Sequence, residues 1–259
     1  SFGWRFINPK MKELYGVDGM GETAENLAEI YKISRESQDE FALHSQQKAT
    51  SAQNSGRLAQ EIVNVKIPQK KGEPKIFSQD EFVKPDTTLD KLAKLRPAFK
   101  KEGGSVTAGN SSGLNDGAAS MILASEDAVK KYNLKPLAKI ISSAVVGVEP
   151  RIMGIGPVEA TKKALSRANL SLEDMDIIEL NEAFAAQSLS VLQELGIDAK
   201  DERLNPNGGA IALGHPLGMS GTRIVGTAAL ELQRKNKKYA LCTLCIGVGQ
   251  GYAMIIEKI

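Results

Sequence analysis

The side chains of this 259-residue chain best suited to proton transfer or nucleophilic attack are few, because it has only two cysteines and two histidines. Cys245 ends a predicted strand and leads into the glycine-rich run Ile246–Gly251. A thiol at a strand end, beside glycines that admit a ligand and expose backbone N–H groups, suits acid–base or nucleophilic chemistry. An inert core cysteine is the alternative interpretation.

The spacing Cys242-x-x-Cys245 also occurs in redox and zinc sites. Residues three apart in a strand point to opposite faces, so the two sulfurs should diverge. There is no second cysteine pair, and we therefore expect no metal and interpret Cys242 as a small buried apolar residue. The glycine run lacks the G-x-G-x-x-G spacing and leads into a strand, which argues against a dinucleotide site.

His215 lies in the run Asn205–Gly218, where glycines and prolines predict a shaped turn just before a helix. An imidazole there would face a cleft next to a helix N-terminus that favours an anion. Asn181 follows the predicted strand Met175–Leu180, where an amide can fix a water or an oxyanion. A solvated histidine and a turn-forming asparagine are the alternatives, and His44 is expected at the surface of a helix.

The elements that would position these residues follow from the apolar periodicity after Pro136. Strands alternating with helices predict an α/β fold with a mainly parallel sheet whose last two strands are antiparallel. The sites of such sheets lie at the carboxyl ends of the strands. The predicted strands are 139–148, 175–180, 239–245 and 252–257, and a capping-box-like run, Ser171–Asp174, precedes the second. The predicted helices are 158–168, 183–195, which Gly196 ends, and 220–234, which Ser220 caps.

The region before Pro136 is less regular. It predicts helices over 23–31 and from the N-cap Ser34 to Gly56. Residues 66–104 are polar, basic and interrupted by prolines, which predicts long loops with short strands. The lysine pairs 70–71 and 100–101 are interpreted as solvated, with contact to an anionic ligand as the alternative.

The composition excludes several classes of protein. Apolar residues make up 42% and charged residues 25%, as in an average soluble chain. The net charge of +2 is too small to indicate nucleic-acid binding, and no apolar run is long enough for a membrane span. Two cysteines exclude a disulfide scaffold and suggest a cytoplasmic protein.

Taken together, the motifs resemble the thiolases, a family of coenzyme A-dependent acyltransferases. The residues that carry the resemblance run along almost the whole chain: Met20–Asn26, Gly109–Ala118, Asn181–Ala185, Asn205–Gly218 and Cys245–Gly249. The related ketoacyl synthases pair two active-site histidines, whereas one histidine is paired with a cysteine here, which favours a thiolase. The resemblance implies a layered αβαβα fold, of which this chain would hold the loop domain (1–113), the end of an N-terminal half (114–135) and the C-terminal half (136–259).

The resemblance also implies roles for individual residues. His215, Cys245, Asn181 and Gly247 would be catalytic: His215 activates a nucleophilic cysteine, Cys245 transfers a proton, Asn181 holds a water, and the Gly247 N–H stabilises an oxyanion. Coenzyme A and acetyl-CoA would be substrates with no further cofactor, and thiolases are commonly dimers or tetramers. The implied acyl-CoA contacts are Met20, Phe99, Ala108, Ser112, Gly113, Ala183 and Phe184.

Within the family, Gly3–Phe6 and Leu14–Asp18 resemble thiolases that act on 3-oxoadipyl-CoA. Its distal carboxylate would need a cation, for which Arg5, Lys10 and Lys12 are candidates. An acetoacetyl-CoA thiolase (acetyl-CoA acetyltransferase) is the alternative.

Thiolases carry their nucleophilic cysteine in an N-terminal half, and this sequence has no counterpart to it. The chain is therefore expected to be a fragment or one piece of a split enzyme, inactive by itself. A non-catalytic, CoA-binding subunit completed by a partner is the alternative from a different functional class.

Overall fold

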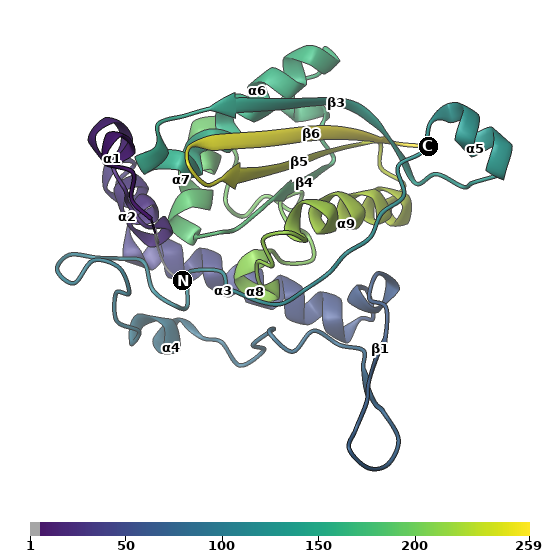
Figure 1. The fold of residues 1–259 in the computed structure, drawn as a ribbon, viewed down its shortest axis with the longest axis horizontal. Coiled ribbons are helices and arrows are strands. Elements are labelled where there is room, and N and C mark those ends of the chain that lie inside the picture. Colours follow the sequence, from purple (N-terminus) through teal and green to yellow (C-terminus); the bar gives the residue numbers. More distant parts are fainter. Residues whose placement is uncertain (1–5) are drawn as a thin grey trace.

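In a computed structural model, which describes residues 6–259, a mixed four-stranded sheet forms the centre of the C-terminal part (Figure 1). Its order is β3-β6-β5-β4, with β3 at Ala138–Gly147, β4 at Ile177–Leu180, β5 at Tyr239–Ile246 and β6 at Gln250–Lys258. The candidate cation Arg5 and the residues Gly3 and Trp4 of the opening motif lie outside the described residues.

The expectation of a mainly parallel sheet is wrong. Only β4 and β5 pair in parallel among the four strands, with Leu180 opposite Thr243. Strand β6 runs antiparallel to both β5 and β3. The physical reason is the short connection after β5, which returns the chain as a hairpin into the position between β5 and β3 instead of through a crossover helix.

Helices cover both faces of this sheet, so α/β layering is confirmed (Figure 1). Helices α6 (Gly156–Ala168) and α7 (Ala185–Leu195) pack on one face in a cluster that includes Ile178, Leu180 and Ile255. Helix α9 (Ser220–Lys235) packs on the other face against Ile177, Cys242 and Ile256. Adjacent residues of β4 therefore point to opposite faces, as in any strand, and both faces are buried.

The local signals for these helices act largely as predicted. Gly196 ends α7 in a left-handed conformation, and Ser171 forms the predicted capping box with Asp174 in the short 3-10 helix η3 (Leu172–Asp174). Ser220 does not cap α9: it is the first helical residue, and Met219 occupies the N-cap without a side-chain hydrogen bond. The hydroxyl of Ser220 instead bonds outside the helix, as described below.

The N-terminal part wraps one side of this layer with α2 (Met20–Ile30) and the long helix α3 (Arg35–Asn54), whose N-cap Ser34 accepts from the Ser37 N–H. Residues 66–104 form extended loops, as expected, with one short helix, α4 (Leu89–Ala93), that the sequence did not predict. The remaining elements are α1 (Pro9–Tyr15), η1 (Leu58–Gln60), β1 (Val65–Ile67), β2 (Lys75–Phe77), α5 (Glu126–Tyr132), η2 (Pro150–Ile155) and α8 (Ala210–Leu213).

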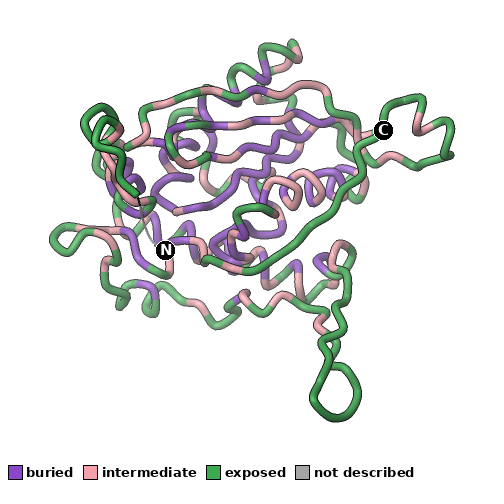
Figure 2. Tube along the Cα trace, in the orientation of Figure 1, coloured by how far each residue is buried: buried purple, intermediate pink, exposed green. Residues whose placement is uncertain are grey.

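Burial divides the chain into a dense centre and exposed extensions (Figure 2). The β1–β2 hairpin and α5 project from the body, and the hairpin strands are almost entirely exposed. The segment before α5 is exposed too, including Ile122 and Leu123 at 82% and 72%. Of the helices in residues 6–259, not one combines the length and apolar character that a membrane span requires.

Candidate active site

The site is built at the carboxyl ends of the parallel strands β4 and β5. Asn181 directly follows β4, is completely buried, and its N–H donates to the Thr243 carbonyl at 3.0 Å. Because alternate residues share a face, Asn181 and Glu179 lie with Ile177 on the side that α9 covers. The register with β5 thus determines where the Asn181 amide points.

The loop that carries His215 is tied to β4 by a buried carboxylate. Glu182 is 2% exposed and accepts from Ser45 Oγ of α3 at 2.6 Å, from Asn205 Nδ2 at 2.7 Å and from the Ile211 N–H at 3.1 Å. Asn205 also bonds both backbone groups of Leu180. These bonds connect α3, β4 and the start of α8, so the 205–213 segment has a fixed path.

His215 lies between two hydrogen-bonding side chains, one directly after β4 and one on α9. Its Nε2 is 3.3 Å from Asn181 Nδ2, and its Nδ1 is 2.6 Å from Ser220 Oγ of α9. The Ser220 hydroxyl donates its proton to the Pro216 carbonyl, so its lone pair accepts from Nδ1–H. The network therefore assigns the Nδ1–H tautomer and leaves Nε2 as the proton acceptor.

The electrostatic surroundings keep this imidazole neutral. Burial lowers the pKa of His215 below its usual value, and the positive charge of Arg223 lowers it further. Gly214 directly precedes the histidine. Its φ is +85°, and a Cβ at this position would lie 2.3 Å from the Asn115 side chain. Only glycine fits both conditions, which explains why it precedes the histidine.

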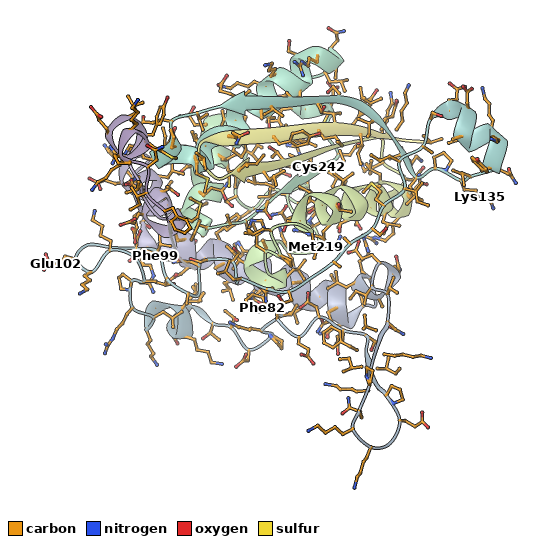
Figure 3. All side chains as sticks on the ribbon, viewed as in Figure 1. Phe82, Phe99, Glu102, Lys135, Met219 and Cys242 are labelled. Atoms are coloured by element: carbon orange, nitrogen blue, oxygen red, sulfur yellow. The ribbon has the colours of Figure 1, made fainter. Side chains whose placement is uncertain are left out.

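The two cysteines point to opposite faces, as predicted. Cys242 is 1% exposed and packs with Ile224 and Ala228 on the α9 face; Figure 3 labels it within the sheet. Cys245 is 7% exposed and packs with Met153 and Ala183. Burial raises the pKa of the Cys245 thiol to about 12, so it is protonated at neutral pH and available as an acid.

The turn after Cys245 has an unusual backbone. Gly247 is half-buried, and a Cβ there would lie 3.9 Å from the sulfur of Met20, which places this turn beside the start of α2. Gly249 has a φ of +89° and would place a Cβ 2.2 Å from the Val148 carbonyl. Val248 also has a positive φ, +70°, which is costly for a β-branched residue.

The segment with Ser112 and Gly113 lies against the same site. Ser112 bonds the Ala183 carbonyl through both its N–H and its hydroxyl at 3.0 Å, and the Gly113 carbonyl accepts from the His215 N–H at 3.1 Å. Phe184 and Ser111 form a β-bridge. The Ser112 hydroxyl therefore donates within the protein and keeps its lone pairs as acceptors for a ligand.

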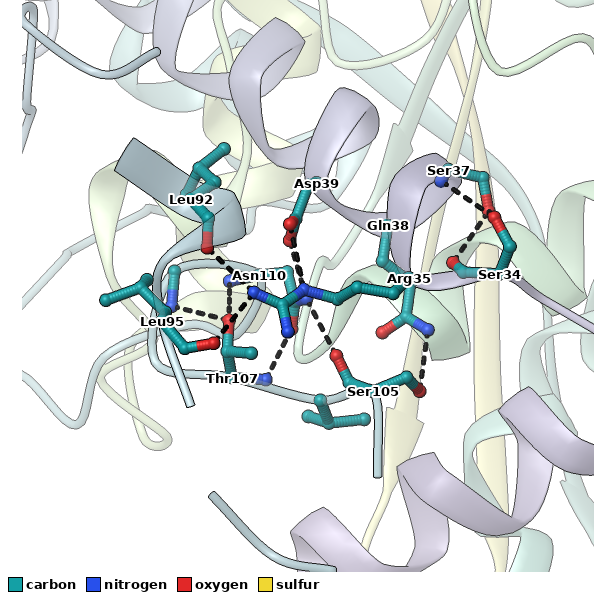
Figure 4. A network of polar contacts seen from close by, with 12 residues as sticks. Ser34, Arg35, Ser37, Gln38, Asp39, Leu92, Leu95, Ser105, Thr107 and Asn110 are labelled. Carbon is teal, nitrogen blue, oxygen red and sulfur yellow. Dashed lines mark hydrogen bonds and ion pairs between the residues drawn. The ribbon is translucent and has the colours of Figure 1, made fainter. Parts of the chain in front are cut away.

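This segment is anchored to α3 by a polar network (Figure 4). Asn110 donates to Asp39 at 2.9 Å and accepts from the Thr107 N–H at 2.7 Å. Arg35 binds the same Asp39 and donates to the carbonyls of Leu92 and Leu95. These hydrogen bonds hold the segment 105–113 against α3.

Only some of the apolar residues expected to contact acyl-CoA lie together in the structure. The rings of Phe99 and Phe184 meet edge to face with centroids 6.0 Å apart, and Phe99 packs over Gly21 at the start of α2 (Figure 3). Phe184 also packs on Cys245 and Ala183. Met20 is 42% exposed at the N-terminus of α2, and Ala108 is exposed.

Sequence reasoning missed the residues that support His215: Ser220, Glu182, Glu179 and Arg223. One signal was available, because Glu179 interrupts the apolar strand Ile177–Leu180, and a charge in a strand buried on both faces needs a partner. Within residues 6–259, no three His, Cys, Asp or Glu side chains are grouped as a metal site would require.

Comparison with known proteins identifies the family. Residues 6–127 match the family description "Thiolase, N-terminal domain" and residues 134–258 match "Thiolase, C-terminal domain". The chain therefore belongs to the thiolase family, and its fold is the thiolase fold.

Among its relatives, the beta-ketoadipyl-CoA thiolase of Acinetobacter baylyi is 59% identical over the whole chain. The 3-oxoadipyl-CoA/3-oxo-5,6-dehydrosuberyl-CoA thiolase of Escherichia coli is 57% identical over the whole chain. The chain spans 64% of the length of both proteins. Human mitochondrial 3-ketoacyl-CoA thiolase in complex with CoA superposes with a TM-score of 0.84 and 48% identity, over 93% of this chain and 59% of that one.

Proposed function

We propose that these residues form the acid–base and oxyanion part of a thiolase active site for 3-oxoacyl-CoA, with 3-oxoadipyl-CoA as the substrate. The reaction is thiolytic cleavage to acetyl-CoA and a shortened acyl-CoA, or the reverse condensation. The observation that carries the proposal is the imidazole held between Asn181 and Ser220 at the end of β4, the strand that pairs with the Cys245 strand β5. The 59% identity to a beta-ketoadipyl-CoA thiolase supports the choice of substrate.

In the cleavage direction, His215 removes the proton of an attacking cysteine thiol through its Nε2 lone pair, which faces Asn181 Nδ2. The thiolate adds to the 3-keto carbon, and the bond between C2 and C3 breaks. Its electron pair passes into the enolate of acetyl-CoA. The Nε2–H now formed and a water on Asn181 donate to the enolate oxygen, where one lost donor typically costs about 3–4 kcal/mol.

Cys245 completes this step by giving its proton to C2 of the enolate. The raised pKa supports this role, since a thiol that is protonated at neutral pH is ready to act as an acid. In condensation the same sulfur removes the proton. The Gly247 N–H is proposed as a donor to the acyl-enzyme oxyanion, on the strained turn that follows the thiol.

The attacking thiol is not one of the two cysteines of this chain. Cys242 packs against α9 with its sulfur 3.8 Å from the Ile224 carbonyl, and Cys245 has the acid–base role. The 259 residues alone are therefore proposed to perform no thiolysis.

For the ligand, we propose that the acyl-CoA lies between the start of α2 and the segment after Ala108. Ser112 would accept from pantetheine amides, and the edge-to-face ring pair would line the apolar part. The contacts proposed are Met20, Phe99, Ala108, Ser112, Gly113, Ala183 and Phe184, with CoA and acetyl-CoA as substrates and no further cofactor. We also propose a domain division at 1–113, 114–135 and 136–259. A homodimer or homotetramer and a cytoplasmic location are further proposals.

Exchange of the acetyl-CoA methyl protons with deuterated water tests the acid–base role without a nucleophilic cysteine. We expect the chain to catalyse exchange, Cys245→Ala to abolish it, and Cys242→Ala to serve as the matched control with unchanged exchange. Exchange that persists in Cys245→Ala, or no exchange with acetyl-CoA bound, would contradict the proposed role.

A further inference from the structure

A buried ion pair joins the two elements that bind the imidazole of His215. Glu179 of β4 accepts from Arg223 of α9 at 3.0 Å, and their side chains are 1% and 14% exposed. Neither residue touches the proposed reacting atoms. An ion pair costs desolvation energy that an apolar pair at this position would avoid, so its presence needs a specific reason.

The pair belongs to a closed frame of contacts around His215. Glu179 is two residues before Asn181 on the same face of β4, and Arg223 is one helical turn after Ser220 on α9. Asn181 and Ser220 are the two residues that bind the imidazole. The ion pair therefore fixes the distance between β4 and α9. Asn181, directly after β4, and Ser220 of α9 bind the ring from these same two elements.

The two charged groups in this frame of contacts also have different surroundings. Glu179 Oε1 is buried and has no hydrogen-bond partner among residues 6–259, whereas the guanidinium projects from the helix that carries the imidazole contact. Like charges close together disfavour each other, so a fixed guanidinium opposes a second positive charge on the ring. A neutral ring is the form that can remove a proton from a thiol.

We infer that Glu179 and Arg223 are positioning residues for His215: they set the distance between β4 and α9, and they place a fixed guanidinium charge one helical turn from Ser220, which binds the ring. This inference rests on the proposed function only for the role of His215. Its geometry stands independently of catalysis.

Other ionisable groups surround the pair and must be considered. Burial raises the pKa of Glu179 to about 7 against the opposing effect of Arg223, and Glu61, Glu182 and Glu231 raise it further. The charge of Arg223 also acts on Asp80 and Cys242. Asp116 is exposed, and its neighbour Gly117 lies against Pro216 of the His215 loop. Arg223 is the charged residue that lowers the pKa of His215.

The chain is well suited to a direct test, because NMR titration of its two histidines separates the site from a control. His44 lies on α3, where burial, Lys200 and Lys48 set its pKa, so it should not respond to changes at Arg223. We expect Arg223→Met to raise the pKa of His215 well beyond the fitting error. Arg223→Lys, which keeps the charge, should leave it near the wild-type value.

Glu179 provides an independent arm of the same experiment. The ring signals of His215 should show a second inflection near pH 7 as Glu179 ionises, and Glu179→Gln should remove it. An unchanged His215 pKa in Arg223→Met, or equal shifts in the Lys and Met variants, would overturn the inference. If Arg223→Met does not fold, an inflection that persists in Glu179→Gln would overturn it instead.

These measurements separate the two proposals. Loss of deuterium exchange with normal titration in the variants would contradict the acid–base function alone. Normal exchange with an unresponsive His215 titration would contradict the positioning role alone.

Discussion

Replacing Ser220 by alanine is the sharpest perturbation of the imidazole site. The Ser220 hydroxyl is 2.6 Å from His215 Nδ1 and donates its own proton to the Pro216 carbonyl. It therefore acts on the ring only as an acceptor. Ser220→Ala leaves Nδ1–H without a partner, while the ring stays half-buried.

The magnitude follows from that single bond. A buried donor left unpaired costs about 1–3 kcal/mol. In a domain of this size that loss corresponds to a decrease in Tm of about 2–4 °C for each kcal/mol. The Nδ1–H tautomer loses the same support, and each 1.4 kcal/mol changes a tautomer ratio about tenfold. We expect a mixed population of tautomers in the variant and almost pure Nδ1–H in the wild type.

Nitrogen-15 NMR of the imidazole rings above pH 7 measures the tautomer directly, with His44 as the internal reference. Ser188→Ala is the matched control, because the Ser188 hydroxyl is fully buried in α7 and no group in the described part of the chain forms a hydrogen bond with it. The reasoning is refuted if Nδ1 of His215 stays equally protonated in Ser220→Ala. It is also refuted if the two serine variants lose the same small free energy of unfolding.

The remaining predictions concern the strained turn, a buried acid and the activity of the isolated chain. Val248→Gly should raise the free energy of unfolding by about 1 kcal/mol in urea titrations, because it removes a positive-φ β-branched residue; no gain would argue against strain. Glu179 has its pKa raised from 4.5 to about 7, so its protonated form is favoured in the fold. Its contribution to stability is therefore complete below pH 4.5 and falls by about 3 kcal/mol as the pH rises to 7. Glu179→Gln should flatten the pH dependence of unfolding in this window, and an unchanged slope would contradict the shift. The isolated chain should cleave no 3-oxoacyl-CoA in a spectrophotometric assay, and turnover by the pure 259-residue species would contradict the assigned roles.

The sequence predicted those parts of the fold that depend on local patterns. The N-cap at Ser34, the capping box at Ser171 and the end of α7 at Gly196 all involve groups within one helical turn. The strands around Ile178 and Leu241 were found because most of their residues are apolar. Local hydrogen bonding and burial are sufficient for such elements.

The sheet order and the support of His215 depend on contacts between distant residues. The position of β6 between β5 and β3 cannot be read from its own alternation, since a strand of this pattern fits either side of β5. Ser220 matched the N-cap preference, yet its hydroxyl is bound to an imidazole five residues earlier, which propensity does not represent. Glu182 contacts Ser45, 137 residues earlier, for the same reason.

The short helix α8 was missed because Ala210–Leu213 is only four residues long and is flanked by glycines. Sequence patterns assign such a segment to a turn, and it forms a helix here because Glu182 binds the Ile211 N–H near its start. A carboxyl group from the loop after β4 thus accepts an N–H that the start of a helix leaves without a backbone partner.

The strand β4 connects these observations. Its alternation places Glu179 and Asn181 on the α9 face and Ile178 and Leu180 on the α7 face. A slip of one residue would exchange the two sets, bury two polar side chains against α7 and move the amide away from His215. The pairing of Leu180 with Thr243 is therefore as important to the site as any side chain in it. Asn205, which bonds both backbone groups of Leu180, secures that register from the other side of the strand.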